Sequence, residues 1–423
     1  MRTAPLRFLA SVNESVLPEA TSPDFTFKYM DISQVDGNGE VSIPDDPTKF
    51  GAAPSRARRL AEPGSTVVST VRTYLRAIAA VPTVDEQLVF STGFAVLRPL
   101  QGDPRYFSYA CRSDAFVNEI VARSVGVSYP AISPSELMGI RLPSPDITQQ
   151  RRIADFLDDR VARIDQIITA RNQQTARLEA SLVRASFDAV RGAGQLARRE
   201  SGLAWLGTIP NSWPLVTVAT EFRVDLGKML DEKRQTGTSA IPYLRNTNVQ
   251  WDHVDVSDLK EMDIDRAERE RYCVRPGDLL ICEGGQPGRS AVWLGELAPL
   301  GFQKALHRAR SRGRSRPEWL LECLRVAAHL NVFAVENGQT TIGHLTNEQL
   351  RSLRLPFPDP SEQDRALERL HSCQAEVRGT QAALTTGVEL LLEYKQSLIT
   401  AAVTGELDVT TAGSGIPNSH LTC

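Results

Sequence analysis

The most constraining feature of the sequence is an internal repeat at a constant offset of 213 residues. Residues 137–157, LMGIRLPSPDITQQRRIADFL, match residues 350–370, LRSLRLPFPDPSEQDRALERL, at 9 of 21 positions. The same offset pairs Tyr106 with Trp319 without a gap. Solenoid repeats are only about 20–50 residues long, so this period indicates a duplicated domain. The alternative is a chance match between two proline-ended strands, but such a match would not extend over so long a gapless span.

A long helical pattern follows each copy of the R-L-P-x-P-D segment. Residues 148–190 and 361–403 carry apolar side chains three and four positions apart in an otherwise charged sequence. Each helix would be about 60 Å long, and a narrow apolar stripe of that length favours a partner helix. We predict that the two helices pair antiparallel; two independent core helices are the alternative. Gly379 and Gly387 predict fraying or a bend in the second helix. The predicted pairing positions are Ile153, Leu157, Val161, Ile164, Ile168, Leu367, Leu370, Val377, Leu384 and Leu391.

The segments before the two helices are typical of mixed α+β domains. Short β-like runs, such as 65–71 and 278–282, are separated by glycine, proline and aspartate turns. One short helix is expected in each segment, over 107–121 and 320–334. The expected order is a globular unit over 1–147, a helix over 148–191, a flexible linker over 192–202, a second globular unit over 203–360, a helix over 361–405, and a disordered tail over 406–423.

Bulk composition gives no sign of a nucleic-acid partner, because the net charge is −3. The basic residues are nevertheless 41 Arg and only 7 Lys, and Arg suits bidentate contacts to guanine and phosphate. No apolar run reaches the roughly 18 residues that a membrane span needs. The six cysteines contain no C-x-x-C pair, which fits a reducing cytosol better than a disulfide framework.

Arginines cluster at two places in the sequence. Five of them alternate over 307–316, and an extended strand would set all five on one face, where they would suit a polyanion. A solvated loop without a partner is the alternative. The repeat pairs Arg76 with Arg289, although a paired arginine is also often an ion-pair partner within the fold. The candidate polyanion contacts are Arg56, Arg58, Arg59, Arg72, Arg76, Arg289, Lys304, Arg308, Arg310, Arg312, Arg314 and Arg316.

The sequence contains none of the common catalytic motifs. The P-loop, G-x-G-x-x-G, H-E-x-x-H and G-x-S-x-G patterns are all absent, as is the Asn/Asp-Pro-Pro-aromatic run of an amino-methyltransferase. The run Gly284–Gly288 does not open a predicted helix, so we expect a hairpin turn there. The six histidines are scattered, which predicts no metal site. The chain is therefore expected to be a binding scaffold without a catalytic centre.

Six phrases of the sequence carry a family resemblance. They are RTYLRAIA at 72–79, STGFAVLRP at 91–99, GVSYPAI at 126–132, WLGTIPNSW at 205–213, PGDLLICEGG at 276–285 and KQSLITAAVTGELD at 395–408. These phrases resemble the specificity (S) subunit of a type I restriction-modification system. The G-x-I-P-x-x-W element stands only before the second globular unit, so its N-terminal counterpart is expected to be absent or the start site misassigned.

The resemblance implies two target recognition domains, each reading one half of a split, asymmetric site in double-stranded DNA. The paired helices would be a spacer and a docking platform for two methyltransferase (M) subunits, and restriction (R) subunits would join for cleavage. S-adenosylmethionine would then belong to the M subunits, and ATP and Mg²⁺ to the R subunit, with no cofactor on this non-catalytic, cytoplasmic chain. The alternatives are an orphan or silent subunit that acts only as a methyltransferase adaptor, a helical adaptor with no DNA role, and a self-contained modification-restriction enzyme.

Overall fold

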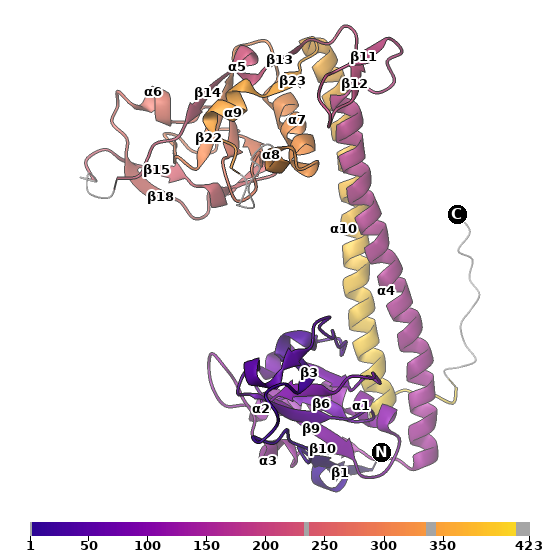
Figure 1. Cartoon of the computed structure of the whole chain (residues 1–423). Helices are drawn as coiled ribbons and strands as arrows, with labels where there is room; N and C mark the ends of the chain where they lie inside the picture. Colours follow the sequence, from indigo (N-terminus) through magenta and orange to yellow (C-terminus); the bar gives the residue numbers. More distant parts are fainter. Residues whose placement is uncertain (1, 232–236, 336–343, 412–423) are drawn as a thin grey trace. The chain divides into compact units, whose positions relative to one another are not determined.

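The computed structural model describes residues 2–231, 237–335 and 344–411 (Figure 1). The chain divides into two compact units, and two long helices, α4 (Ile147–Val190) and α10 (Pro360–Thr404), each contribute to both of them. Unit 1 comprises Met1–Asn172 and Leu384–Cys423, and unit 2 comprises Gln173–Ala383. Among the described residues, no helix is long and apolar enough to cross a membrane.

Unit 1 is built on two four-stranded sheets. The first is antiparallel with the order β2-β9-β6-β7, and the second has the order β4-β3-β8-β5, in which β3 and β8 are parallel. The strand β1 pairs separately with β10. The elements are β1 (Thr3–Pro5), β2 (Ala10–Val12), β3 (Thr26–Met30), β4 (Thr48–Lys49), β5 (Ala57–Ala61), β6 (Thr66–Ser69), the 3₁₀ turn η4 (Thr73–Leu75), β7 (Ile78–Ala80), β8 (Leu88–Ser91), β9 (Phe94–Pro99), α1 (Pro104–Arg112), α2 (Asp114–Arg123), α3 (Pro134–Leu137) and β10 (Arg141–Pro143).

Unit 2 repeats this plan. Its main sheet has the order β14-β22-β19-β20, a second sheet has the order β18-β15-β21 with β15 and β21 parallel, and β13 pairs with β23. The elements are β11 (Arg198–Glu200), β12 (Thr208–Pro210), β13 (Leu215–Thr217), α5 (Val218–Glu221), β14 (Phe222–Leu226), β15 (Ala240–Leu244), β16 (Val249–Gln250), β17 (His253–Val254), β18 (Lys260–Asp263), α6 (Arg269–Tyr272), β19 (Leu279–Cys282), β20 (Ser290–Val292), β21 (Gly301–Phe302), β22 (Leu306–Ser311), α7 (Pro317–His329), α8 (Val332–Val335), α9 (Asn347–Ser352) and β23 (Arg354–Pro356).

The predicted α+β fold with an internal repeat is confirmed. A hydrogen bond that occurs at equivalent positions of both units shows how closely the two copies agree. Tyr106 on α1 donates its hydroxyl to the carbonyl of Pro143 at 3.2 Å. At the repeat-related positions, Trp319 on α7 donates Nε1 to the carbonyl of Pro356 at 2.8 Å. Both rings are buried, so each polar atom needs this partner. The aromatic pair that reveals the repeat in the sequence therefore ties a helix to the proline-ended strand in each unit.

Within unit 1, the first part of α4 packs against the last part of α10 and against the sheet core. Lys395 of α10 is buried in this contact, and its Nζ lies 2.7 Å from Oδ1 of Asp165 on α4. Leu384, Leu391 and Ile168 are half buried. The buried apolar side chains are Ile153, Leu157, Val161 and Ile164 from α4, and Leu398, Ile399, Ala402 and Val403 from α10.

Within unit 2, the opposite ends of the same helices meet. Leu367 near the start of α10 packs in one core with Val190 at the end of α4, and Leu370 and Val377 are also buried. The two helices therefore run antiparallel, as predicted. The start of α4 also packs in the core of unit 1, and the start of α10 packs in the core of unit 2. The alternative of a helix that packs on its own domain therefore describes these two helix starts.

Two predictions about the helices differ from the structure in detail. The short helix expected over 107–121 is two helices, because Ser113 has an extended backbone with ψ 146° and separates α1 from α2. The fraying expected at Gly379 or Gly387 does not occur, because α10 is one continuous helix from Pro360 to Thr404. A Cβ atom at Gly387 would collide with the guanidinium of Arg171 on α4, so the glycine leaves room for this side chain between the two helices.

The predicted flexible linker and the start of the predicted disordered tail are both packed against the fold. Residues 198–200 form β11, and Arg198 donates hydrogen bonds to the carbonyls of Gly192 and Arg191, at 2.7 and 2.9 Å. Leu407 and Val409 lie half buried against the core of unit 1. The prediction of disorder over 412–423 lies outside the described residues.

Candidate nucleic-acid interface

Three of the candidate arginines of unit 1 converge at one edge of its sheets. The loop 70–77 connects β6 to β7, and the N–H of Thr70 donates to the carbonyl of Gly93 at 2.8 Å. In the next turn, the N–H of Thr92 donates to the carbonyl of Arg56 at 2.8 Å. This edge, the loop end of unit 1, consists of Arg56, the turn 91–93 and the loop 70–77, which carries Arg72 and Arg76.

The basic cluster around Arg56 is partly engaged within the fold. Arg56 donates to the hydroxyl of Tyr29 at 2.9 Å and to the carboxylate of Asp31 at 2.5 Å. The bond to Tyr29, followed by that to Asp31, raises the pKa of Arg56 above its ordinary value. Arg58 lies over the ring of Phe50, with 5.3 Å from the guanidinium carbon to the ring centroid, and Arg59 is half buried in β5. Arg56 itself stays exposed and charged, so it remains accessible to a polyanion.

Arg72 and Arg76 bracket η4 in a strained backbone. Both adopt left-handed φ values, 50° and 56°, which cost a non-glycine residue about 1–3 kcal/mol each. The guanidinium of Arg72 lies over the ring of Tyr129, 4.9 Å from its centroid. Arg76 forms an ion pair with Asp114 at the start of α2, and Asp114 also accepts a hydrogen bond from Gln396 of α10 at 3.1 Å. Arg76 is therefore a brace for the loop, whereas Arg72 lies half buried over the exposed ring of Tyr129.

The loop between β19 and β20 occupies the equivalent end of unit 2. The predicted hairpin turn at Gly284–Gly288 connects these strands, and Arg289 donates to the carbonyl and to Oδ1 of Asn246, at 3.1 and 2.8 Å. Asn246 in turn donates to the carbonyl of Gly284 at 2.9 Å. Arg289 thus braces its loop as Arg76 does. Lys304 is exposed at this same end, two residues before β22.

The predicted single face of five arginines over 307–316 does not form. The strand β22 ends at Ser311, and Gly313 turns the chain with φ 88°. Arg312 and Arg314 follow the strand and are exposed, and Arg316 precedes α7 and pairs with Asp364 at 2.7 Å. Only Arg308 and Arg310 therefore lie on the strand, and both point into a network of carboxylates.

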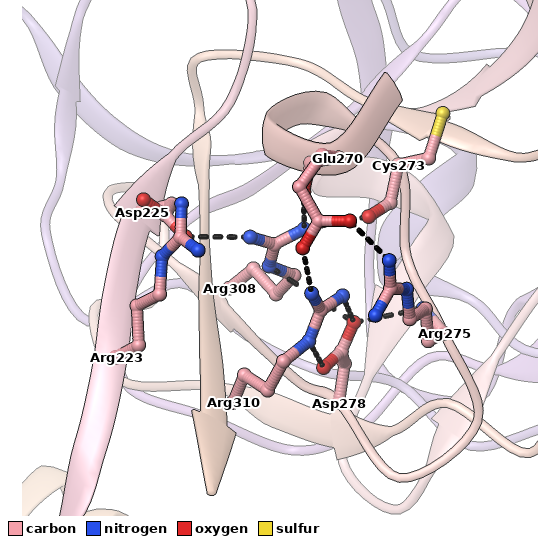
Figure 2. Close-up of polar contacts among 8 residues, drawn as sticks. All are labelled: Arg223, Asp225, Glu270, Cys273, Arg275, Asp278, Arg308 and Arg310. Carbon is pink, nitrogen blue, oxygen red and sulfur yellow. Dashed lines mark hydrogen bonds and ion pairs between the residues drawn. The ribbon is translucent and has the colours of Figure 1, made fainter. Parts of the chain in front are cut away.

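Figure 2 shows this network around Arg308, whose side chain is 0% exposed. Arg308 donates to the carboxylate of Asp225 at 2.5 Å and to the carbonyl of Cys273 at 2.6 Å. Burial, followed by repulsion from Arg310, lowers its pKa. Arg310 makes two hydrogen bonds of 2.7 Å to Asp278, and these raise its pKa.

The outer part of the network joins it to α6. Glu270 on α6 lies 3.3 Å from Arg310 and also pairs with Arg275, while Arg223 on β14 lies 3.0 Å from Asp225 (Figure 2). A buried charge that loses its partner costs about 3–5 kcal/mol. Arg308 is therefore a structural arginine that joins β14, β19 and α6, and its selection as a polyanion contact is wrong.

The loop end of unit 1 also contains exposed apolar residues, which the prediction from arginine and lysine positions did not include. Tyr74 in η4 is 55% exposed, and Tyr129 beneath Arg72 is 65% exposed. The available signal was compositional, because the segment 124–131 carries Val125, Val127 and Tyr129 among glycine, serine and proline. Apolar side chains in such a segment cannot all reach a core.

The thiols and acidic side chains form no chemical centre in the described residues. The side chains of Cys111, Cys273, Cys282 and Cys323 are buried, and burial raises the pKa of each thiol, which leaves it protonated and a poor nucleophile. Within residues 2–231, 237–335 and 344–411, no group of three or more histidine, cysteine, aspartate or glutamate side chains is placed to hold a metal ion.

Comparison with known proteins identifies relatives for this arrangement. The chain is 23% identical over 313 residues to the type I restriction enzyme EcoKI specificity subunit of Escherichia coli (strain K12), covering 71% of this chain and 65% of the relative. It is 28% identical over 138 residues to the EcoBI specificity subunit of Escherichia coli, covering 33% and 28%. It is 24% identical over 223 residues to the StySPI specificity subunit of Salmonella potsdam, covering 51% and 46%. The chain is a homologue of type I specificity subunits.

The chain spans less than two thirds of the length of these curated relatives, and no family model matches it. Solved structures show the same fold. A chain in "Structural basis underlying complex assembly and conformational transition of the type I R-M system" has a TM-score of 0.71 at 22% identity, covering 96% of this chain and 98% of that one. The HsdS subunit from Thermoanaerobacter tengcongensis has a TM-score of 0.50 at 22% identity, covering 96% and 97%. The resemblance expected from the sequence phrases is confirmed.

Proposed function

We propose that this chain is the DNA-specificity component of a type I restriction-modification complex, and that each unit reads one half of a split, asymmetric site. One observation carries the proposal. The hairpin loops β6–β7 and β19–β20 lie at equivalent ends of two sheets with the same strand order, yet their residues differ. A common framework with two different reading surfaces is what recognition of two different half-sites requires.

The cations at these loop ends would set the position of the DNA backbone. In unit 1 they are the exposed Arg56 and the half-buried Arg72, and in unit 2 the exposed Lys304 lies at the corresponding end. Contacts of arginine and lysine to phosphate fix the register of a protein on duplex DNA, and base-edge contacts then select the sequence. Arg312 and Arg314 are exposed at the other end of β22, where they would contact DNA only through a second surface.

The long helices would dock two M subunits, which would supply S-adenosylmethionine and the methyl transfer. Exposed apolar side chains on this helix pair support a protein partner: within unit 1, Ile167 of α4 and Leu390 and Tyr394 of α10 are all exposed. R subunits, with ATP and Mg²⁺, would join the resulting complex. In this assignment the chain itself has no catalytic role.

Methylome sequencing tests the proposal. A host that carries the chain with its M subunit is compared with the same host lacking the chain. A split methylated motif that disappears with the chain supports the specificity function and gives both half-sites. Absence of any chain-dependent motif would refute it and favour the silent adaptor, for which the exposed helix residues are the supporting feature.

A further inference from the structure

The loop end of unit 1 exposes a group of apolar side chains that its core does not use. We call this group the apolar loop cluster. Tyr74 and Tyr129 are more than half exposed, and Val125 is 76% exposed. Exposed apolar residues that stand singly are ordinary, but a contiguous group indicates a binding surface. The members of the cluster are Val71, Tyr74, Leu75, Val125, Val127 and Tyr129.

The members come from two chain segments that backbone pairing holds side by side. Val71 and Val125 each form a β-bridge with Ala131, which places the loop 70–77 beside the segment 124–131. The guanidinium of Arg72 covers the ring of Tyr129 at 4.9 Å, so a cation lies within the apolar cluster. Among the described residues, no acidic side chain lies within ion-pair distance of Arg72.

The cluster is held firmly rather than left as a loose loop. The N–H of Arg72 donates to the carbonyl of Pro130 at 2.8 Å, and the hydroxyls of Thr73 and Ser124 share a hydrogen bond of 2.8 Å. The ion pair of Arg76 with Asp114 secures the other end of η4. The strained backbone at Arg72 and Arg76 holds Tyr74 and Leu75 in exposed positions. Because such strain is concentrated at functional sites, we infer that these two side chains have a function outside the fold.

We propose that the apolar loop cluster enters a groove of duplex DNA at the half-site read by unit 1. Tyr74 and Leu75 would contact base edges or thymine methyl groups, and Arg72 would contact a neighbouring phosphate. This inference rests on the proposed function, because it assumes that unit 1 reads DNA. It adds a recognition chemistry, apolar contact, and the side chains that provide it.

The repeat favours DNA over a protein as the occupant. Two identical M subunits would need a surface that recurs in both units, but the loop of unit 2 at the same place has Gly285, Gln286 and Pro287 and no large apolar side chain. Different loops are expected if each unit reads a different half-site. Arg56 lies at the same sheet edge as the cluster and adds an exposed cation to the half-buried Arg72 for the DNA backbone.

The test compares Tyr74→Ala and Leu75→Ala with matched controls in the full chain, expressed with its M subunit. Phe8→Ala and Leu100→Ala are the controls, because both side chains are exposed and apolar. Both lie at the end of the sheet opposite the loop 70–77. That loop follows Ser69 at the end of β6, whereas Leu100 follows the end of β9, which lies beside the start of β6 at Thr66. Phe8 is close to Leu100, because the N–H of Leu100 donates to the carbonyl of Leu9. Gln286→Ala, in the loop of unit 2, identifies the other half-site.

We expect each cluster variant to lower methylation by about 5- to 100-fold, or to relax the preferred base, within one half-site only. The controls should match the unaltered chain, and Gln286→Ala should affect the opposite half-site. An unchanged motif and methylation level in both cluster variants would overturn the inference. Loss of M-subunit co-purification would also overturn it, because the cluster would then be a protein-docking surface. Failure of the unaltered chain to produce any motif would instead refute the proposed function itself.

Discussion

Replacing Arg308 with methionine should destabilise unit 2, although the residue belongs to a basic run that looks like a nucleic-acid contact. The substitution removes the 2.5 Å partner of Asp225, whose side chain is only 15% exposed, and the donor to the carbonyl of Cys273. Asp225 then keeps only the outer Arg223, while Asp278 keeps Arg310. Removal of one member of a buried ion pair costs about 3–5 kcal/mol. Methionine refills most of the volume beside Phe302, so the loss reports charge rather than a cavity.

Tryptophan fluorescence provides a selective assay. All five tryptophans, at 205, 213, 251, 293 and 319, belong to unit 2, so their emission reports the unfolding of that unit. With a urea dependence of about 3 kcal/mol per molar, the expected loss lowers the urea midpoint by about 1–1.7 M. Arg312→Met is the matched control from the same run. Its side chain is exposed, so we expect a change within about 0.5 kcal/mol.

Equal, small midpoint shifts for the two variants would refute a structural role for Arg308. Such a result would mean that water reaches Arg308 and its carboxylates and screens them. A larger shift for Arg312→Met would likewise show that the assignment of structural and exposed arginines is reversed. Far-UV circular dichroism of both variants at zero urea separates a loss of stability from a failure to fold.

Three further predictions concern other parts of the molecule. Burial lowers the pKa of His307, whose Nε2 donates to the carbonyl of Leu345, while Glu283 opposes the shift. The unfolded chain therefore binds the proton more readily, so unit 2 should lose stability as the pH falls through about 6.5, and His307→Gln should flatten this dependence in urea titrations. In unit 1, Lys395→Met should destabilise more than the double variant Lys395→Met/Asp165→Leu, measured by thermal unfolding, because only the single change leaves Asp165 unpaired; equal losses would contradict this. Deleting one heptad within 170–184 and the matching heptad of α10 should change the gap in the methylated motif but neither half-site, as read from the methylome; an unchanged gap would contradict a spacer role.

The sequence predicted the large features because they depend on local periodicity and on duplication. The helices α4 and α10 begin and end within about one residue of their predicted bounds, since apolar spacing and terminal glycines act over single turns. The hairpin at Gly284–Gly288 was predictable for the same reason. The order of the segment 192–202, which was predicted to be flexible, could not be foreseen, because it depends on hydrogen bonds from the side chain of Arg198 to carbonyls six and seven residues earlier.

The candidate site was predicted only in part, because charge in a sequence does not reveal its partners. Arg56 and Arg72 do lie together at an exposed edge, but that edge is created by the pairing of strands far apart in the chain. Tyr74 and Tyr129 were missed because the prediction selected residues by charge, and tyrosine is as often partly exposed as buried.

The sequence by itself determined that this protein has two related units and two long helices that need each other, because repeats and helical periodicity are written in consecutive residues. Only the tertiary structure decided which arginines are free. Arg308 and Arg312 are indistinguishable in their alternating run, yet one meets Asp225 from another strand while the other meets solvent. The physical reason is that the environment of a charge depends on residues brought close by folding, and burial then turns a surface cation into a structural one.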